Sequence, residues 1–214
     1  THAGISDPGK VLFDVDSFAK NTVTQEIADA KHVLENIKNG NIPEQFGFSE
    51  QWNGEIYLLG HSLGGAISIL TASRESGINK LAVWASIAKF DRYSKRQKDE
   101  WISQGYIEFE NTETGQILRM DATYVRDILD HKDEYSLPDA AAKLDIPFLI
   151  VHGQQDVVVP MRENEQLKRK AKDDLTEFHV IEKAGHVFGA EHPFKETNDS
   201  LEEALDLTLK FFGL

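Results

Sequence analysis

Cysteine is absent from the 214 residues, which excludes a disulfide framework, a thiol nucleophile and thiolate metal ligands. Long hydrophobic runs are absent too, because no apolar stretch approaches the roughly 18 residues that a membrane-spanning helix needs. The start of the chain has no basic segment followed by an apolar one, so no signal peptide is visible. This pattern is compatible with a cytoplasmic protein that has no membrane partner.

Basic charge is scarce, since 23 Lys and Arg face 36 Asp and Glu and give a formal net charge of −13. An acidic chain repels polyanions, and no basic stripe with interleaved aromatics offsets that repulsion, so we expect no nucleic-acid partner. No set of His, Asp and Glu has the spacing of zinc ligands, so we expect no metal, and nothing indicates another cofactor. The oligomeric state stays open, with a homodimer among the possibilities.

Short apolar runs alternate with helical patterns along most of the chain, which is long enough for one domain with a substantial core. Strands separated by helices predict a parallel α/β sheet. The two most apolar runs, 56–59 and 147–151, are typical of strands covered on both faces. The predicted strands are 56–59, 81–84, 147–151 and 177–181, and the predicted helices are 23–37, 63–76, 161–171 and 201–212.

One segment breaks this alternation. Residues 86–145 contain an alternating strand pattern at 106–110, turn residues at 111–115, a second strand at 117–120 and a helix at 124–131. We interpret 86–145 as a small cap inserted into a core made of 1–85 and 146–214. Long insertions of this kind often carry function.

The sharpest motif is Gly60-His61-Ser62-Leu63-Gly64-Gly65, placed between a predicted strand and a predicted helix. A strand–G-x-S-x-G–helix segment is typical of a nucleophile elbow, a sharp turn that projects the serine hydroxyl from the sheet edge. Gly60 and Gly64 would remove bulk on either side of Ser62, and Gly65 would let the helix pack close to the strand.

The helix that follows the elbow directs its free N–H groups toward developing negative charge. The backbone N–H of Leu63 is therefore the expected oxyanion donor. His61 stands beside the nucleophile in sequence, but we expect its side chain to point elsewhere and to serve packing.

A nucleophilic serine needs a base and a third group that orients the base. Asp156 follows the strand at 147–151 on a turn, where the acid belongs. His186 follows the strand at 177–181 on a glycine-flanked loop and is the predicted base. His192 is its rival, although it lies further from the strand end. His152 is expected to pack within the acid turn.

These residues resemble the α/β-hydrolase superfamily in the elbow, in the acid turn at 153–160 and in the base motif at 184–186. Within it the chain looks most like the esterases related to cinnamoyl/feruloyl esterases and dienelactone hydrolases, which carry a compact cap where this chain has 86–145. The resemblance implies an α/β-hydrolase fold and an esterase. Prolyl oligopeptidases are close relatives of these esterases, so an acyl-peptide substrate is an alternative.

The front of the chain departs from the family pattern. Members normally begin with three or four strands, and one of the following loops supplies a second oxyanion N–H. Residues 1–7 already resemble the segment after the fourth strand. We therefore expect the second donor, and the missing strands, upstream of Thr1; if nothing preceded Thr1, the strand at 56–59 would be an uncovered apolar edge.

The sequence thus predicts a serine hydrolase in which Ser62 attacks a carboxylic ester of a small molecule, His186 moves its proton and Asp156 holds the imidazole. A peptidase or thioesterase with the same triad, and a non-catalytic binding protein, are the alternatives. Aromatic residues of the cap either line an acyl pocket or form the cap's own core; they are Trp101, Tyr106, Phe109 and Tyr124.

Overall fold

The computed structural model describes residues 5–7, 12–111, 115–191 and 194–214. The chain divides into two compact units. The larger one, which we call the sheet unit, consists of Lys31–Lys89 and Ser136–Leu214, and the smaller one, the hairpin unit, of Thr1–Ala30 and Phe90–Tyr135. Unlike the insertion expected from the sequence, the hairpin unit therefore includes the start of the chain and leaves 86–89 and 136–145 to the sheet unit.

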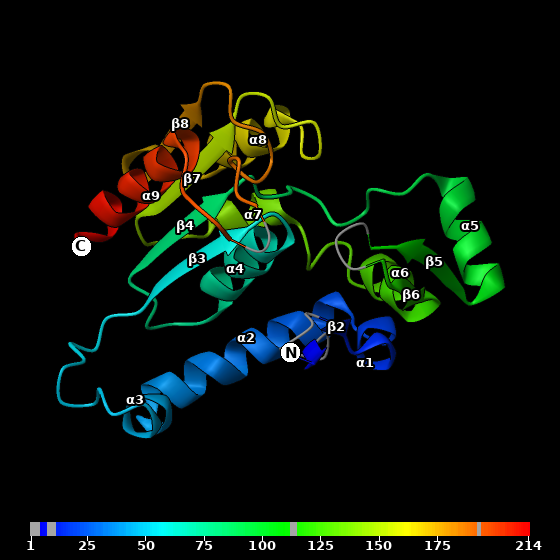
Figure 1. Cartoon of the computed structure of the whole chain (residues 1–214), viewed down its shortest axis with the longest axis horizontal. Helices are drawn as coiled ribbons and strands as arrows, with labels where there is room; N and C mark the ends of the chain where they lie inside the picture. The colour runs from blue at the N-terminus through cyan, green and yellow to red at the C-terminus, as the bar shows by residue number, and fades with distance from the viewer. Residues whose placement is uncertain (1–4, 8–11, 112–114, 192–193) are drawn as a thin grey trace. The chain divides into compact units, whose positions relative to one another are not determined.

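The sheet unit is built on four strands in the order β3-β4-β7-β8 (Figure 1). All three pairings are parallel, and each strand lies within two residues of a predicted one. The strands are β3 (Tyr57–His61), β4 (Lys80–Trp84), β7 (Phe148–Gly153) and β8 (Thr176–Ile181). The predicted parallel α/β fold, with helices flanking the sheet, is confirmed.

Helices connect and cover these strands. The predicted helices at 63–76, 161–171 and 201–212 are confirmed as α4 (Leu63–Arg74), α8 (Met161–Lys170) and α9 (Asp199–Phe212). The predicted helix at 23–37 is α2 (Val23–Lys38), which begins in the hairpin unit and ends in the sheet unit. Sequence reasoning missed the short α3 (Asn41–Gln45) and α7 (Leu137–Ala142), and the 3₁₀ turn at Asp173–Leu175.

The two strands predicted to be covered on both faces differ in the structure. Every residue of β7 is buried, as predicted, because β7 has a strand on each side and contacts the helices α8 and α9. In contrast β3 is only partly buried, and Leu59 is 49% exposed. The prediction for β3 is wrong because β3 lies at the edge of the four described strands and α9 packs over β7 and β8.

The hairpin unit contains the two predicted antiparallel strands, β5 (Tyr106–Glu110) and β6 (Ile117–Asp121). Residues 112–114 of the turn predicted between them lie outside the described residues. The predicted helix at 124–131 is α6 (Ala122–Asp130). The other elements, which the sequence analysis did not predict, are β1 (Ile5–Asp7), β2 (Leu12–Phe13), α1 (Val15–Ala19) and α5 (Lys95–Gln104).

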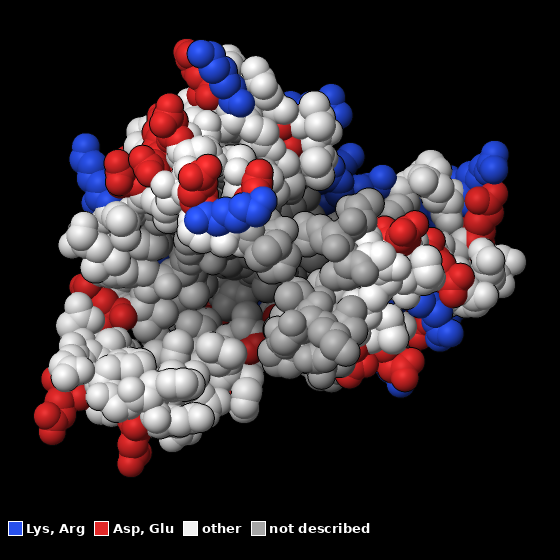
Figure 2. All heavy atoms as spheres, viewed as in Figure 1, with Lys and Arg blue, Asp and Glu red and all other residues white. Residues whose placement is uncertain are grey.

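Charge on the face drawn in Figure 2 is mixed, with the coloured Lys and Arg side chains scattered among Asp and Glu rather than gathered in a stripe. Within the described part of the chain, no helix is both long and apolar enough to cross a membrane.

Candidate active site

The predicted nucleophile lies in a strained turn between β3 and α4. Ser62 has φ 55° and ψ −117°, a backbone conformation that non-glycine residues seldom adopt. Hydrogen bonds hold it there, because its N–H donates to the carbonyl of Trp84 at 2.9 Å and its carbonyl accepts the N–H of Ile87 at 3.4 Å. The β3-to-α4 turn is thus the sharp strand–turn–helix segment that the motif predicted.

The three glycines around Ser62 do not have equal roles. A Cβ on Gly60 would lie 2.4 Å from the carbonyl oxygen of Gly64, and one on Gly65 would lie 2.7 Å from the Cβ of Ser86, so both positions need glycine. Apart from its chain neighbours and the backbone of its own helix, a Cβ on Gly64 would meet no described atom within 4 Å. The expectation that Gly64 removes bulk is therefore wrong within the described structure, since that side of the turn is open.

Asp156 lies on the turn after β7 with its side chain fully buried. Its Oδ1 accepts the backbone N–H groups of Val158 and Val159 at 2.8 and 2.9 Å. Burial alone would raise the pKa of Asp156, but the hydrogen bonds from His186 and from these two N–H groups outweigh it and hold the pKa below its ordinary value. The carboxylate is therefore charged at neutral pH.

His186 lies between Asp156 and Ser62. Its Nδ1 is 2.8 Å from Asp156 Oδ2, and its Nε2 is 3.0 Å from Ser62 Oγ. Because the carboxylate can only accept, Nδ1 carries the proton, which leaves Nε2 free to accept from the serine hydroxyl. The structure thus brings together the three residues predicted as nucleophile, base and acid. The rival His192 lies outside the described residues.

Residues of other elements fix the loop that carries His186. Lys183 and Phe188, one on each side of His186, have φ values of 61° and 55°, which cost about 1–3 kcal/mol each and persist only where the surroundings fix them. Phe188 is buried against Trp84, at 5.4 Å between ring centroids. The acid turn holds the other side, where Gln155 N–H donates to the carbonyl of Ala184 at 2.8 Å.

Gly153 is the point of closest approach between the acid turn (153–160) and the loop that carries His186 (182–189), which we call the base loop. A Cβ at this position would lie 2.5 Å from the carbonyl oxygen of Ala184 and 2.6 Å from that of Gly185. Glycine therefore sets the separation of the two loops, and with it the distance between Asp156 and His186.

His152 is fully buried at the end of β7, as the packing role predicted from the sequence requires. Its Nε2 lies 3.8 Å from Asp156 Oδ2, too far for a hydrogen bond. Burial lowers the pKa of His152, so the ring is neutral beside the carboxylate.

The side chain of His61 lies elsewhere than the sequence predicted. Its side chain was expected to point away from the site, but its Nε2 lies 2.8 Å from the backbone carbonyl oxygen of His186, and the two imidazole rings are 4.7 Å apart between centroids. The residue before the nucleophile therefore contacts the residue predicted as base. The motif gave no signal of this, because the contact spans 125 positions of sequence.

Two buried side chains of α8 fix the segment that follows β4 and borders Ser62. Asn164 donates to the carbonyl of Ser86 at 2.7 Å, and Glu163 accepts the N–H of Ala88 at 2.8 Å. Sequence reasoning missed both residues, because α8 reads as a charged surface helix and the contacts span more than seventy positions.

The predicted oxyanion donor, Leu63, is the first residue of α4. Its backbone N–H is one of those that a helix leaves without an intrahelical acceptor, and it points where the helix N-terminus favours negative charge. The second donor was predicted upstream of Thr1 and stays a prediction. Residues 1–4 of the segment that prompted it lie outside the described residues.

The four aromatic residues predicted to bind an acyl group lie in the hairpin unit. Trp101 and Tyr124 are buried and stack at 6.0 Å between ring centroids, and Trp101 Nε1–H donates to the carbonyl of Met120 at 2.9 Å. Tyr106 lies against Arg119, and Phe109, 40% exposed, lies 6.0 Å from Phe18. All of these contacts are internal to the hairpin unit.

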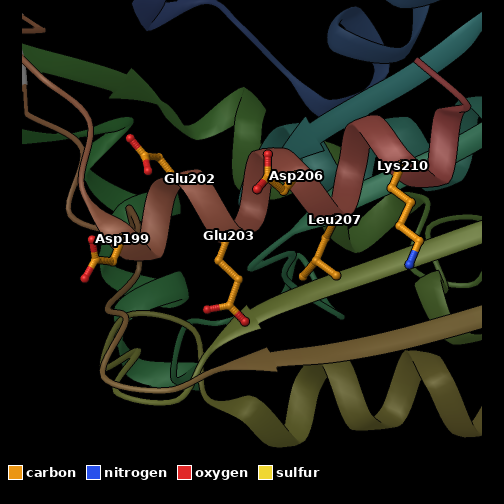
Figure 3. Close-up of a pocket in the computed structure, with 6 residues that line it drawn as sticks. All are labelled: Asp199, Glu202, Glu203, Asp206, Leu207 and Lys210. Atoms are coloured by element: carbon orange, nitrogen blue, oxygen red, sulfur yellow. The ribbon is translucent and has the colours of Figure 1, made fainter.

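An open surface depression of about 410 Å³ runs along α9 (Figure 3). The lining residues are Asp199, Glu202, Glu203, Asp206, Leu207 and Lys210. All come from one helix and none belongs to the Ser62 site, and the four carboxylates disfavour an anionic ligand. No group of three or more His, Asp or Glu among the described residues is arranged to hold a metal ion.

A parallel sheet flanked by helices, with a strained serine turn, an acid and a histidine in loops that follow three of its strands, defines a hydrolase-type α/β fold. The Alpha/beta hydrolase family matches residues 17–200 of the sequence. The chain belongs to this family.

Solved structures with the same fold include three at low sequence identity. Monoacylglycerol lipase from Paleococcus ferrophilus shares 15% identity over 90% of this chain and 76% of its own, with a TM-score of 0.63. The alpha/beta hydrolase GrgF from Penicillium sp. sh18 shares 15% over 90% and 72%, with a TM-score of 0.63. Est1E from Butyrivibrio proteoclasticus shares 18% over 91% and 72%, with a TM-score of 0.53. No curated protein sequence matches this chain.

Proposed function

We propose that this protein is a serine hydrolase that cleaves carboxylic esters of small molecules through an acyl-enzyme intermediate. The observation that carries the proposal is the unbroken chain of hydrogen bonds from Asp156 Oδ2 through His186 to Ser62 Oγ, at 2.8 and 3.0 Å. A serine activated by an oriented histidine is the arrangement that acyl transfer requires.

In the proposed first step, Ser62 Oγ attacks the ester carbonyl while His186 Nε2 accepts the hydroxyl proton. The carbonyl oxygen becomes an oxyanion, which the N–H of Leu63 stabilises, and Asp156 stabilises the imidazolium. When the intermediate collapses, the carbon–oxygen bond to the leaving alcohol breaks and His186 returns the proton to that alcohol. Water then attacks the acyl-Ser62 ester by the same route and releases the carboxylic acid.

The preference for esters rests on the resemblance of the elbow, the acid turn and the base motif to esterases. The net charge of −13 favours neutral over anionic substrates. Among the aromatic residues of the hairpin unit, Phe109 is the proposed contact for the acyl chain because it is exposed, whereas Trp101 and Tyr124 are buried against each other. Thioesters and peptides use the same chemistry and are the alternatives that a substrate panel separates.

The test is covalent labelling with a fluorophosphonate, read by intact-protein mass spectrometry, with Ser62→Ala as the control. We expect one adduct on the unchanged protein and none on Ser62→Ala, followed by turnover of p-nitrophenyl esters. Ser73, a partly buried serine of α4 that donates to the carbonyl of Leu70, provides a matched variant, since Ser73→Ala should label normally. Absence of any adduct on Ser62 in a chain that is folded by circular dichroism would overturn the proposal.

A further inference from the structure

The side chain of His61 contacts the proposed base through its ring and through one hydrogen bond. A carbonyl oxygen can only accept, so His61 Nε2 must carry the proton that it shares with the carbonyl of His186 at 2.8 Å. His186 carries its own proton on Nδ1, toward Asp156. The two rings, 4.7 Å apart, are therefore in opposite tautomers.

This arrangement excludes His61 as an alternative base. Its Nε2 already donates to the carbonyl, and no described hydrogen bond joins its ring to Ser62 Oγ, which is paired with His186 Nε2. Loss of surrounding water lowers the pKa of His61 and outweighs the hydrogen bond to the carbonyl of His186, which raises it, so His61 is a neutral donor at neutral pH. Any contribution of His61 to the reaction is therefore made through its contact with His186.

Two consecutive residues, His61 and Ser62, contact the same histidine from two sides. Ser62 meets the His186 side chain at Nε2, and His61 meets the His186 main chain at its carbonyl oxygen. Ser62 itself is fixed to the neighbouring strand through Trp84. The elbow therefore holds both ends of His186, and the distance from Oγ to Nε2 depends on both contacts.

The base loop needs such a contact. Lys183 and Phe188 adopt positive φ values on either side of His186, so local backbone preference does not fix the loop. The hydrogen bond from the acid turn reaches the loop at Ala184, before His186, and the packing of Phe188 on Trp84 holds it after His186. Among the described contacts, the His61 hydrogen bond is the one that reaches the backbone of His186 itself.

We infer that His61 is a positioning residue, which sets the orientation of the His186 imidazole toward Ser62 by bonding its backbone carbonyl and packing against its ring. The inference rests on the proposed function for its catalytic consequence, although the positioning of His186 is measurable without turnover. Because His61 acts on the base, its removal should lower kcat while KM changes little.

The experiment compares His61→Leu, which removes the N–H donor and the ring, with His61→Gln, whose side-chain N–H reaches to a similar distance. His32 is exposed on α2, and its described hydrogen bonds outside the helix backbone are with Asn36, so His32→Leu is the matched control. Each protein is assayed for kcat and KM with p-nitrophenyl esters. The proton on His186 Nδ1 is followed by NMR in the same samples.

We expect His61→Leu to lower kcat by roughly 10–100-fold with KM within about twofold, since a small misplacement of a reacting group costs rate on this scale. His61→Gln should recover most of that loss, and His32→Leu should match the unchanged protein. The Nδ1 proton should exchange with water faster in His61→Leu than in His61→Gln.

Three results would overturn the inference: unchanged kcat and Nδ1 exchange in His61→Leu, a change confined to KM, or equal losses in His61→Leu and His61→Gln. The first means that His61 does not position the base, the second that it contacts substrate, and the third that the hydrogen bond is irrelevant. If the unchanged protein hydrolyses no ester, the proposed function fails, while the NMR comparison still decides whether His61 orients His186.

Discussion

In the sheet unit, the polar side chains of the candidate active site lie in loops at the ends of strands. In the hairpin unit, by contrast, large aromatic side chains are buried in the interior of the unit. Ser62, Asp156 and His186 follow β3, β7 and β8, and side-chain hydrogen bonds join His186 to Asp156 and to Ser62. In the hairpin unit, Trp101 and Tyr124 are buried against each other. Aromatic residues in a predicted cap are therefore weaker indicators of a binding site than polar residues at strand ends.

The largest expected effect tests the sheet unit. Asp156→Asn should lower kcat by about 10⁴, because an amide can present an N–H to His186 and favour the wrong tautomer. The measurement is the steady-state rate with an activated ester. Asp173→Asn changes an exposed aspartate paired with Lys168 and should leave the rate unchanged. A loss smaller than about tenfold in Asp156→Asn would mean that the carboxylate does not orient the base.

The next effect tests the hairpin unit. Trp101→Ala should destabilise this unit by about 3–5 kcal/mol, since it removes a ring that is 1% exposed and packs between Tyr93 and Tyr124. Hydrogen exchange resolved by segment measures the loss. Fluorophosphonate labelling of Ser62 should persist, because the residues that hold the triad all lie in the sheet unit.

Phe109→Ala provides the contrast, since Phe109 is 40% exposed and its loss should cost less stability. If Trp101 lined an acyl pocket rather than the core of the hairpin unit, Trp101→Ala would raise KM for long-chain esters while the exchange rates stayed unchanged. That outcome would mean that an aromatic residue of the hairpin unit binds substrate, as the polar residues of the sheet unit are proposed to do.

Strand order and helix order could be predicted from the sequence because they depend on local patterns. The runs that became β4, β7 and β8 are apolar, and the pattern at 106–110 alternates as a half-buried strand does. The helix α5 was missed even though Ser94 and Gln97 form a capping box, a signal that the sequence does contain.

The remaining features depend on contacts between distant positions. Residues 1–30 join the hairpin unit through pairs such as Thr24 with Asp127 and Phe18 with Phe109, which no local pattern announces. The exposure of Leu59 depends on where α9 packs, and the contact of His61 with His186 depends on the shape of the base loop. The triad residues could be predicted because the ends of parallel strands meet at one edge of a sheet. The residues that hold the triad in place could not be predicted, because their contacts join distant positions of the sequence.

A smaller effect is the difference in stability between alanine substitutions at Gly60 and Gly64. Gly60→Ala should destabilise the protein by about 1–3 kcal/mol, because its Cβ would overlap the backbone of Gly64. Gly64→Ala should be neutral or slightly stabilising, since its Cβ meets no described atom within 4 Å apart from its chain neighbours and its own helix backbone, and alanine favours a helix. Urea unfolding of both variants measures the difference, and equal losses would show that both sides of the turn are closed.

The smallest effect is the pH dependence that Asp156 adds to stability. Its folded-state pKa lies below the ordinary value of 3.8, so the unfolded state binds its proton more readily. The stabilisation is therefore fully present above pH 3.8 and is lost as the pH falls through the lower folded-state pKa. Asp156→Asn lacks this titration, whereas exposed Asp14, whose pKa is also lowered, titrates in both proteins and cancels.

The measurement is the difference in free energy of unfolding between the unchanged protein and Asp156→Asn, from urea titrations between about pH 7 and about pH 2.5. We expect a constant difference in favour of the unchanged protein at the higher pH values, and a decrease at the lowest ones. A difference that grew toward low pH would mean that burial outweighs the hydrogen bonds from His186, Val158 and Val159. Asp156 would then resemble an ordinary buried carboxyl group rather than one held charged for the neighbouring imidazole.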